Sequence, residues 1–295
     1  MKILITGGNG FIGKSLYNTL HLENDIVIVD RQIDLKCDNT TKIVTDLSVD
    51  CGLLEDEIKK CDLVIHLASP VGIFNIDKNS NTFLDQMLKI NLNVFNLVKK
   101  YNKKIIYSST SEVYLNTENA KESDNLTIGA PDKLRWGYAS GKLTSEFLCK
   151  SLCKNSIILR FFNATGIGDN KGVLYRFIQS IKNDKNIDIF GNGKQKRTFC
   201  DIRDVTNFIS ILIDKNTYDG NIYNVGNSNN VISINDLAKL CLVKTKSKVN
   251  INYIKYNDVF SKNYDDINIR IPNCDKMNKL MTSQYSIDDI IESIL

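Results

Sequence analysis

Residues 3–16 of this chain read ILITGGNGFIGKSL, and this segment gives the strongest indication of its fold. It begins with an apolar run typical of a strand, continues through a glycine-rich turn and ends in a helical pattern. A strand that enters a helix through such a turn directs backbone N–H groups and the positive end of the helix dipole towards a pyrophosphate. The spacing of Gly7, Gly10 and Gly13 therefore predicts a dinucleotide-binding turn, although the glycines alone also fit a strand–helix turn without a ligand.

A carboxylate follows the second apolar run of the chain. Asp30 ends the run that starts at Ile26, seventeen residues after Gly13. At this place a carboxylate accepts hydrogen bonds from a ribose 2′-hydroxyl and repels a 2′-phosphate. The pattern therefore favours NAD over NADP, and the neighbouring Arg31 is the residue that could weaken this preference.

Strand-like and helix-like segments alternate over the first half of the chain. Strands are expected near 2–6, 26–30, 42–45, 62–66, 104–108 and 156–161, and helices near 11–21, 52–60, 81–101 and 135–153. This order predicts an α/β fold with a Rossmann-like, doubly wound parallel sheet that helices cover on both faces. The polar connectors at 115–125 and 214–221 are expected to be surface loops.

The regular alternation stops after residue 161, which suggests a second lobe. We expect 1–162 to form an NAD-binding Rossmann domain, to which 200–225 returns. The remaining segments, 163–199 and 226–295, are expected to form a smaller, substrate-binding lobe towards the C-terminus. In open α/β sheets ligands bind in a crevice at the carboxyl ends of the strands, so the site is expected there.

Composition excludes several classes of protein. The chain has 295 residues, of which 42% are hydrophobic and 24% charged, which is ordinary usage for a globular enzyme. A net charge of +4, without a basic run interleaved with aromatics, argues against nucleic-acid binding. No apolar stretch is long enough to span a membrane, and the first residues enter a strand directly, so we expect no signal peptide and a cytoplasmic location. Eight dispersed cysteines and two histidines predict reduced thiols and no metal site.

The candidate catalytic pair is Tyr138 and Lys142. Four residues apart on a predicted helix, they lie on one face. A tyrosine hydroxyl is a poor base at neutral pH, but a nearby ammonium and a positively charged nicotinamide both favour the phenolate. The phenolate would take a hydroxyl proton while hydride leaves for NAD⁺. Thr110, at the end of the strand expected near 104–108, would hydrogen-bond the same oxygen.

These motifs resemble those of extended short-chain dehydrogenases/reductases that act as nucleotide-sugar epimerases, dehydratases and decarboxylases. The similarity runs nearly from end to end of the chain. It is carried by GGNGFIG at 7–13, HLASPV at 66–71, SSTSEVY at 108–114, YASGK at 138–142, LRFFNATG at 159–166, GNGKQKRTFCDIRDV at 191–205, YNVGN at 223–227 and Arg270-x-Pro272. The resemblance implies a Rossmann-like fold, NAD as cofactor, a nucleotide-sugar substrate, with a UDP-sugar favoured, and a homodimer.

The resemblance also implies roles for individual residues. Cofactor contacts are implied for Phe11, Ile12, Asp46, Leu47, Leu67, Ala68 and Asn91, beside the glycines and Asp30. Substrate contacts are implied for Asn163, Val173, Leu174, Arg176, Phe190, Arg197 and Arg270. Arginine suits this second group, because a guanidinium can bind a diphosphate at two points.

The reaction depends on Ser111 and Glu112, since a 4-keto sugar can be epimerised, dehydrated or decarboxylated. In the family, 4-epimerases usually carry small residues at these two positions, and dTDP-glucose 4,6-dehydratases carry Asp-Glu. Ser-Glu resembles UDP-glucuronate decarboxylases, including the decarboxylase domain of the bacterial aminoarabinose-pathway enzyme, in which residues matching Ser111, Glu112 and Arg197 take part in losing CO₂. GDP-mannose 4,6-dehydratases share the Ser-Glu pair, with the glutamate as base at C5. We expect a decarboxylase, with a 4,6-dehydratase or a 4-epimerase as the alternatives.

Two departures from the family pattern bear on this choice. Leu115 occupies the place of the glycine that usually follows SEVY, and FNATG at 162–166 is more typical of an epimerase. An NAD(P)H-dependent 4-keto reductase would be expected to carry a basic residue in place of Asp30. A non-catalytic NAD-binding module would usually have lost Tyr138 or Lys142, and this chain keeps both.

The predicted helix at 81–101 is apolar on more than one side, which suits a helix that is buried twice. It is either a deep core helix or one that packs on the sheet with one face and on a second copy of the chain with another. In the second case it would pair with the helix at 135–153 in a four-helix contact, and we expect such a homodimer.

Overall fold

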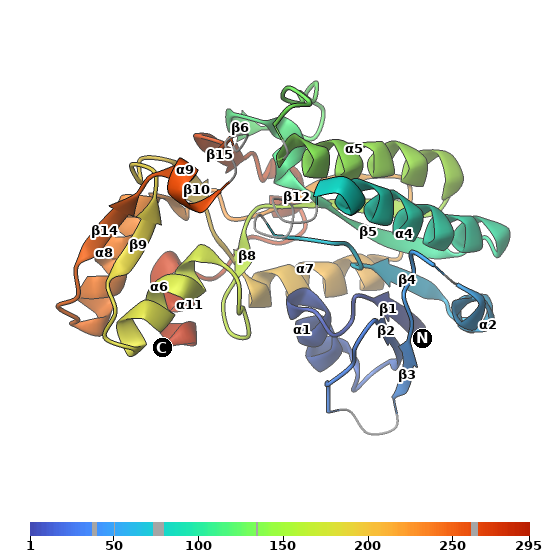
Figure 1. Cartoon of the computed structure of the whole chain (residues 1–295). Helices are drawn as coiled ribbons and strands as arrows, with labels where there is room; N and C mark the ends of the chain where they lie inside the picture. Colours follow the sequence, from blue (N-terminus) through green and yellow to red (C-terminus); the bar gives the residue numbers. More distant parts are fainter. Residues whose placement is uncertain (37–39, 50, 73–79, 134, 261–264) are drawn as a thin grey trace. The chain divides into compact units, whose positions relative to one another are not determined.

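The computed structural model describes residues 1–36, 40–49, 51–72, 80–133, 135–260 and 265–295 (Figure 1). The chain forms two compact units. The first unit comprises Met1–Thr110, Gly137–Arg160 and Thr206–Tyr223, and the second comprises Ser111–Trp136, Phe161–Val205 and Asn224–Leu295. Each unit contains segments that lie far apart in the sequence, and the chain passes from one to the other several times.

A seven-stranded sheet forms the centre of the first unit, in the order β12-β7-β5-β4-β1-β2-β3. Its strands are β1 (Lys2–Thr6), β2 (Asp25–Asp30), β3 (Thr41–Val44), β4 (Leu63–His66), β5 (Lys104–Thr110), β7 (Ser156–Phe161) and β12 (Ile222–Val225). The strands that flank β1 run parallel to it, and the order reverses direction there. The predicted doubly wound parallel sheet is therefore confirmed.

Helices cover both faces of this sheet: α4 and α5 lie together on one face, and α1 and α7 on the other (Figure 1). Their bounds are α1 (Phe11–Leu20), α2 (Gly52–Lys60), α4 (Ser80–Lys100), α5 (Arg135–Leu152) and α7 (Ile202–Lys215). Because both faces are covered, the central strands are mostly apolar, and Ile3, Leu4 and Ile5 of β1 have no exposed surface. The predicted strands and helices of this region match the observed ones to within one or two residues.

The second unit is built from smaller sheets. Four strands form the order β13-β10-β15-β6, and two further pairs are β14-β9 and β11-β8. The strands are β6 (Thr117–Ala120), β8 (Ala164–Thr165), β9 (Ile187–Phe190), β10 (Lys196–Thr198), β11 (Cys200–Asp201), β13 (Val231–Ser233), β14 (Ile251–Ile254) and β15 (Ile269–Pro272). The helices are η1 (Ser111–Tyr114), α6 (Val173–Lys182), α8 (Ile234–Thr245), α9 (Tyr256–Val259), α10 (Asp275–Asn278) and α11 (Ile287–Ile294).

An apolar core holds α6, α8 and α11 against β9. Its fully buried members include Leu174, Ile187 and Leu237. Two of these helices have well-formed N-termini, because the hydroxyls of Ser233 and Ser286 accept hydrogen bonds from the backbone three residues later. The core and the caps explain why short elements form a stable unit here.

One predicted loop is wrong. The connector 115–125 contains β6, which pairs in parallel with β15, and Ala120 is fully buried. The backbone of Asn273 also donates to the carbonyl of Ala120. The partner strand lies about 150 residues further along the chain, so no local pattern could reveal the pairing. As a result, the segment 111–136 belongs to the second unit.

Candidate active site

The dinucleotide-binding turn leaves no room for side chains at two of its glycines. Gly7 has a φ of +70°, and a Cβ there would lie 2.7 Å from the backbone nitrogen of Ala68 and 2.9 Å from the carbonyl carbon of Leu67. A Cβ on Gly13 would lie 2.5 Å from the carbonyl oxygen of Gly7. Gly7, Gly13, Leu67 and Ala68, all predicted cofactor residues, therefore meet at the carboxyl ends of β1 and β4.

Helix α1 begins directly after this turn. Gly10 is its N-cap in an extended conformation, and no side chain caps the helix. Phe11 and Ile12 are its first residues and are half-buried. The first N–H groups of an α-helix have no partner within the helix, so this terminus suits a pyrophosphate.

Asp30 lies at the end of β2, beside the same turn. Its carboxylate accepts hydrogen bonds from the backbone nitrogens of Asn9, at 3.0 Å, and Arg31, at 2.7 Å. Each carboxylate oxygen can accept more than one hydrogen bond, so both keep the capacity to bind a ribose hydroxyl. The turn, the helix terminus and this carboxylate together fit an NAD molecule.

Asp46 and Leu47 follow β3, but they differ in exposure. Asp46 is exposed and accepts hydrogen bonds from the backbone and hydroxyl of Ser48, which lower its pKa. Leu47 is buried in the core, and its carbonyl accepts a hydrogen bond from Asn93 at 2.8 Å. Asp46 is thus available to a ligand, whereas the side chain of Leu47 is committed to packing.

Asn91, a predicted cofactor contact, is buried inside the first unit. Its side chain has no exposed surface, and its oxygen lies 2.9 Å from Nε2 of His66. Its amide nitrogen donates to the hydroxyl of Ser145 at 2.6 Å. The amide is therefore hydrogen-bonded inside the first unit, and the direct contact between Asn91 and the cofactor stays a prediction.

His66 connects this amide to the dinucleotide-binding turn. Nδ1 of His66 lies 2.6 Å from the hydroxyl of Thr6, the residue before Gly7. Because the Asn91 oxygen can only accept, Nε2 carries the proton and Nδ1 accepts from Thr6. Burial, with a smaller contribution from Lys142, lowers the pKa of His66 to about 3, so the ring is neutral. We call the chain Thr6, His66, Asn91 and Ser145 the neutral network.

Lys142 lies beside the neutral network on α5. Its side chain is 2% exposed, and Nζ donates to the carbonyl oxygen of Ser108 at 2.8 Å. Burial lowers the pKa of Lys142 to about 7, and the negative charge of Glu146 only partly opposes this. Tyr138, one turn earlier on the same helix, is half-buried and packs edge-on against Phe83. A nearby anion, such as a phenolate, would restore the charge on this lysine.

The predicted catalytic residues are divided between the units. Tyr138 and Lys142 belong to the first unit, and so does Thr110, which ends β5 and is 7% exposed. Ser111 and Glu112 open η1 in the second unit, and Ser111 is almost fully buried. The division falls at the peptide bond between Thr110 and Ser111.

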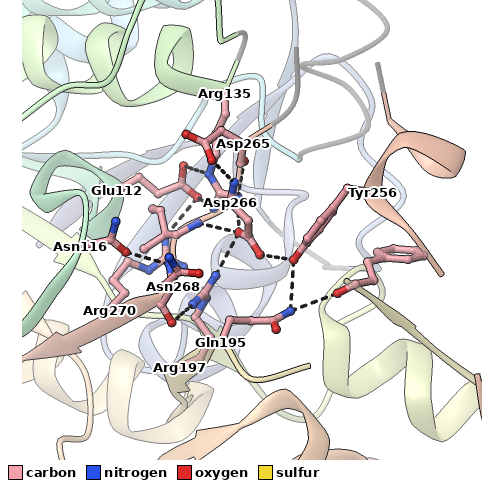
Figure 2. A network of polar contacts seen from close by, with 12 residues as sticks. Glu112, Asn116, Arg135, Gln195, Arg197, Tyr256, Asp265, Asp266, Asn268 and Arg270 are labelled. Atoms are coloured by element: carbon pink, nitrogen blue, oxygen red, sulfur yellow. Dashed lines mark hydrogen bonds and ion pairs between the residues drawn. The ribbon is translucent and has the colours of Figure 1, made fainter. Parts of the chain in front are cut away.

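Glu112 is held between two arginines within the second unit (Figure 2). Arg135 donates to it from two nitrogens, from Nε to Oε2 at 3.2 Å and from Nη2 to Oε1 at 3.0 Å. Nη1 of Arg270 lies 3.1 Å from Oε1. Burial favours the neutral acid, but the two guanidiniums outweigh it and lower the pKa of Glu112. Glu112 is therefore an ionised carboxylate.

A second carboxylate, Asp266, joins the remaining arginine to this group (Figure 2). Its Oδ1 accepts from Nη1 of Arg135 at 2.7 Å and from Nη2 of Arg197 at 3.0 Å. Its Oδ2 accepts from the hydroxyl of Tyr256 at 2.6 Å. We call Glu112, Arg135, Arg197, Asp266 and Arg270 the charged network.

The charged network carries one more positive than negative charge, since it has three arginines and two carboxylates. Burial and two neighbouring arginines lower the pKa of Arg197 to about 10, yet it remains a cation at neutral pH. Nη2 of Arg270 donates to Asn163 at 2.8 Å, while its Nε has no hydrogen-bond partner among the described residues. An excess buried positive charge with an unused donor is suited to an anionic ligand.

Four predicted substrate residues lie on α6 and at the end of β9 in the same unit. The guanidinium of Arg176 stacks 5.0 Å from the ring of Phe190, which packs edge-on against Phe260. Val173 opens α6, and the next residue, Leu174, is fully buried in the core. The side chain of Leu174 packs in the core with β9 and α8, and its contact with the substrate stays a prediction.

Sequence analysis missed Arg135, Asp266 and Tyr256. Arg135 had one local signal, since it lies three residues before Tyr138 and so on a neighbouring part of the helix surface. Asp266 and Tyr256 had none, because Asp266 contacts Arg135 and Arg197, and Tyr256 contacts Gln195, all far away in the sequence.

The seven cysteines of the described segments are free thiols. Those segments contain neither a group of His, Cys, Asp or Glu placed to hold a metal nor a helix long and apolar enough to cross a membrane.

Comparison with known proteins agrees with this geometry. The chain is 28% identical over 294 residues to a UDP-N-acetyl-alpha-D-glucosaminuronate decarboxylase from Bacillus cytotoxicus, covering 95% of the chain and 91% of the relative. It is 31% identical over 317 residues to the bifunctional polymyxin resistance protein ArnA of Wigglesworthia glossinidia brevipalpis, and here 95% of the chain spans 48% of the relative.

A solved structure shows the same fold. It is the UDP-glucuronic acid 4-epimerase from Bacillus cereus, in complex with UDP-glucuronic acid and NAD. The TM-score is 0.86 at 24% identity, over 99% of this chain and 97% of that one. The model of the NAD dependent epimerase/dehydratase family matches residues 3–226. With the dinucleotide-binding turn and the Tyr138/Lys142 helix already in place, this match shows that the chain belongs to the NAD dependent epimerase/dehydratase family.

Proposed function

We propose that the protein is a nucleotide-sugar decarboxylase that oxidises a UDP-uronate at C4 and then releases CO₂ from C5. The observation that carries this proposal is the charged network, in which Glu112 lies between Arg135 and Arg270 with Arg197 close by. The curated relative that covers most of both chains acts, by its name, on such a substrate. Its name adds an N-acetyl group to the sugar, so both UDP-glucuronate and its N-acetylated form are candidates.

The first step would use the residues of the first unit. Tyr138, as phenolate, takes the proton of the C4 hydroxyl, and Thr110 holds the oxygen as it becomes a carbonyl. Lys142 stabilises the phenolate, because opposite charges attract each other more strongly in a buried site than in water. Bound NAD⁺ would supply the hydride acceptor. Gly7, Gly13 and Asp30 would hold it, with Asp30 disfavouring a 2′-phosphate.

The second step would use the charged network. With a ketone at C4, a carboxylate at C5 belongs to a β-keto acid. Breaking the bond between C5 and the carboxylate would release CO₂ and leave an enolate with its charge on the C4 oxygen. C5 would then take a proton from water to give the 4-keto-pentose. No base is needed to start this step. The guanidiniums of Arg197 and Arg270 are suited to bind the anionic groups of the substrate.

The environment of Glu112 also argues against the nearest alternative. A 4,6-dehydratase needs a base that removes the C5 proton, and an efficient base has a pKa near the working pH. Two guanidiniums lower the pKa of Glu112 and occupy its oxygens, which makes it a poor proton acceptor. We therefore infer that Glu112 orders the arginines rather than moving a proton.

The test is a panel of substrates with the purified protein and NAD⁺. UDP-glucuronate or its N-acetylated form should yield CO₂ and a UDP-pentose or UDP-4-keto-pentose without added reductant, followed by NMR. Glu112→Gln should abolish CO₂ release. Both UDP-uronates recovered unchanged, with UDP-glucose, dTDP-glucose, CDP-glucose or GDP-mannose converted instead, would refute the decarboxylase. A 6-deoxy-4-keto product would then identify a dehydratase, and an inverted C4 an epimerase.

We further propose that the protein is a homodimer that buries an apolar surface of α4 and α5. Leu84 and Leu92 on α4 are each more than a third exposed, and Phe147 on α5 is 69% exposed. Size-exclusion chromatography with light scattering should give twice the chain mass. Phe147→Glu should give a monomer, while Val243→Glu, at an equally exposed position on α8, should remain a dimer.

A further inference from the structure

Arg135 makes the most extensive contact with Glu112 in the charged network. Its side chain is 3% exposed, and two of its three nitrogens contact the two oxygens of Glu112. The third nitrogen, Nη1, is bound to Asp266 at 2.7 Å. All three nitrogens of the guanidinium are therefore engaged with carboxylates, which leaves Arg135 little freedom to turn.

The other charged neighbours of Glu112 hold it less firmly. Arg270, from β15, is 3.1 Å from Oε1, but its Nη1 is not oriented to donate, and its Nη2 is committed to Asn163. Arg197, from β10, binds Asp266 and acts on Glu112 through its charge. A guanidinium that contacts both oxygens of a carboxylate fixes the orientation of the carboxylate, whereas a contact with one oxygen does not.

We propose that Arg135 is a positioning residue that holds Glu112 as an ionised carboxylate in one fixed orientation. Arg135 precedes Tyr138 by three residues on α5, so the helix that carries the tyrosine also begins with the group that orients Glu112. The positioning follows from the contacts alone. Its consequence for catalysis rests on the proposed function.

The direct test is the titration of Glu112 in the full-length protein, followed by NMR of ¹³C-labelled glutamate carboxyls. The signal of Glu112 is identified by its absence from the spectrum of Glu112→Gln. In Arg135→Gln, burial remains and the strongest opposing charge is gone, so the titration midpoint of Glu112 should rise by about one to three pH units. Arg135→Lys keeps a charge but cannot contact both oxygens at once, so its rise should be smaller.

Asp266→Asn is the matched control, since it breaks the ion pair between Arg135 and Asp266, which Arg135→Gln also breaks. It removes a negative charge near Glu112 and leaves the two contacts from Arg135 in place. The midpoint of Glu112 should therefore fall or stay unchanged. If Arg135 served only to keep the network folded, both variants would shift the midpoint in the same direction. That result, or an unchanged midpoint in Arg135→Gln, would overturn the proposal, and Arg135→Lys decides if Arg135→Gln does not fold.

The activity assay gives a second, separate readout. On the substrate that releases CO₂, Arg135→Gln should lower kcat by about tenfold or more with a smaller change in KM, and Arg135→Lys should recover part of the loss. A wild-type protein without decarboxylase activity would contradict the proposed function and leave the titration result standing. A normal kcat in a folded Arg135→Gln would contradict the catalytic consequence of the positioning.

Discussion

The two buried polar networks of this protein use opposite physical means. In the first unit, Thr6, His66, Asn91 and Ser145 are joined by hydrogen bonds between uncharged groups, and burial keeps His66 neutral. In the second unit, three arginines and two carboxylates are joined by ion pairs. Arg197 stays charged there although burial lowers its pKa. A buried polar group needs only hydrogen-bond partners, whereas a buried charge also needs an opposite charge.

The two networks are suited to different tasks. A fully bonded neutral network has no charge to offer, so it can only hold its surroundings in place, here the dinucleotide-binding turn and the helix of Lys142. The charged network has an excess positive charge, which suits the binding of an anion. We therefore propose that the first unit carries the oxidation chemistry and that the second selects the substrate and the outcome.

The largest expected effect comes from removing Lys142, the buried lysine beside the neutral network. Lys142→Met should lower the rate of C4 oxidation by about 10²–10⁴, because the tyrosine loses the charge that favours its phenolate. Glu112→Gln should instead retain oxidation while losing CO₂ release. Absorbance of NADH at 340 nm in a single turnover separates the two. Equal loss of NADH formation in both variants would contradict the division of tasks.

The same lysine should make the stability of the ligand-free protein depend on pH. Its folded pKa of about 7 lies below the ordinary value of 10.5, so between these pH values the unfolded chain binds more protons. The free energy of unfolding should therefore rise with pH across this window, and more steeply in the wild type than in Lys142→Met. Urea titrations at pH 7 and 9 measure the difference, and parallel slopes would show that Lys142 is not buried as described.

An intermediate effect is expected for stability in acid, where the two networks should lose their stabilising contributions at different pH values. The folded pKa of His66, about 3, is below its ordinary value of 6.5, so His66 costs stability as the pH falls below about 6.5. The folded pKa of Glu112 is also lowered, but from 4.5, so its stabilising contribution is lost only below that pH.

Variants at each position should remove one of these two acid responses. His66→Leu removes the acceptor of the Thr6 hydroxyl proton and the donor to the Asn91 oxygen, which should cost about 2–4 kcal/mol at pH 7. It should also abolish the fall in stability between about pH 6.5 and 5, which Glu112→Gln should retain. Thermal unfolding from pH 7 to 4 provides the measurement. A fall of equal size in His66→Leu would mean that the ring is protonated in the native protein.

The smallest expected effect concerns the turn that follows Glu112. Leu115 has a φ of +58°, a conformation that costs a residue with a Cβ about 1 kcal/mol. Leu115→Gly relieves this strain but increases the entropy of the unfolded chain, so the gain in the free energy of unfolding should be below about 1 kcal/mol. Leu115→Ala keeps the strain and should be less stable than Leu115→Gly. The reverse order in urea unfolding would show that packing of the leucine outweighs the strain.

Much of the first unit could be predicted from its sequence. Its strands are apolar and its helices amphipathic, so local periodicity reveals them, and the glycine spacing reveals the turn. The role of Asn91 could not be predicted, because His66 and Ser145 bond to it from other elements of the unit. The position of the 115–125 segment depends in the same way on β15, a distant strand.

The fold class and the family could be read from the sequence, which also predicts the residues of the oxidation step. Each of these depends on motifs of a few neighbouring residues, such as Gly7 to Gly13 and Tyr138 to Lys142, whose geometry a single turn or helix dictates. Only the tertiary structure decided that Arg135 and Asp266 enclose Glu112 and Arg197. Residues 112, 135, 197 and 270 come from η1, α5, β10 and β15, and Asp266 lies just before β15. Their charges interact because folding buries them within a few ångströms of one another.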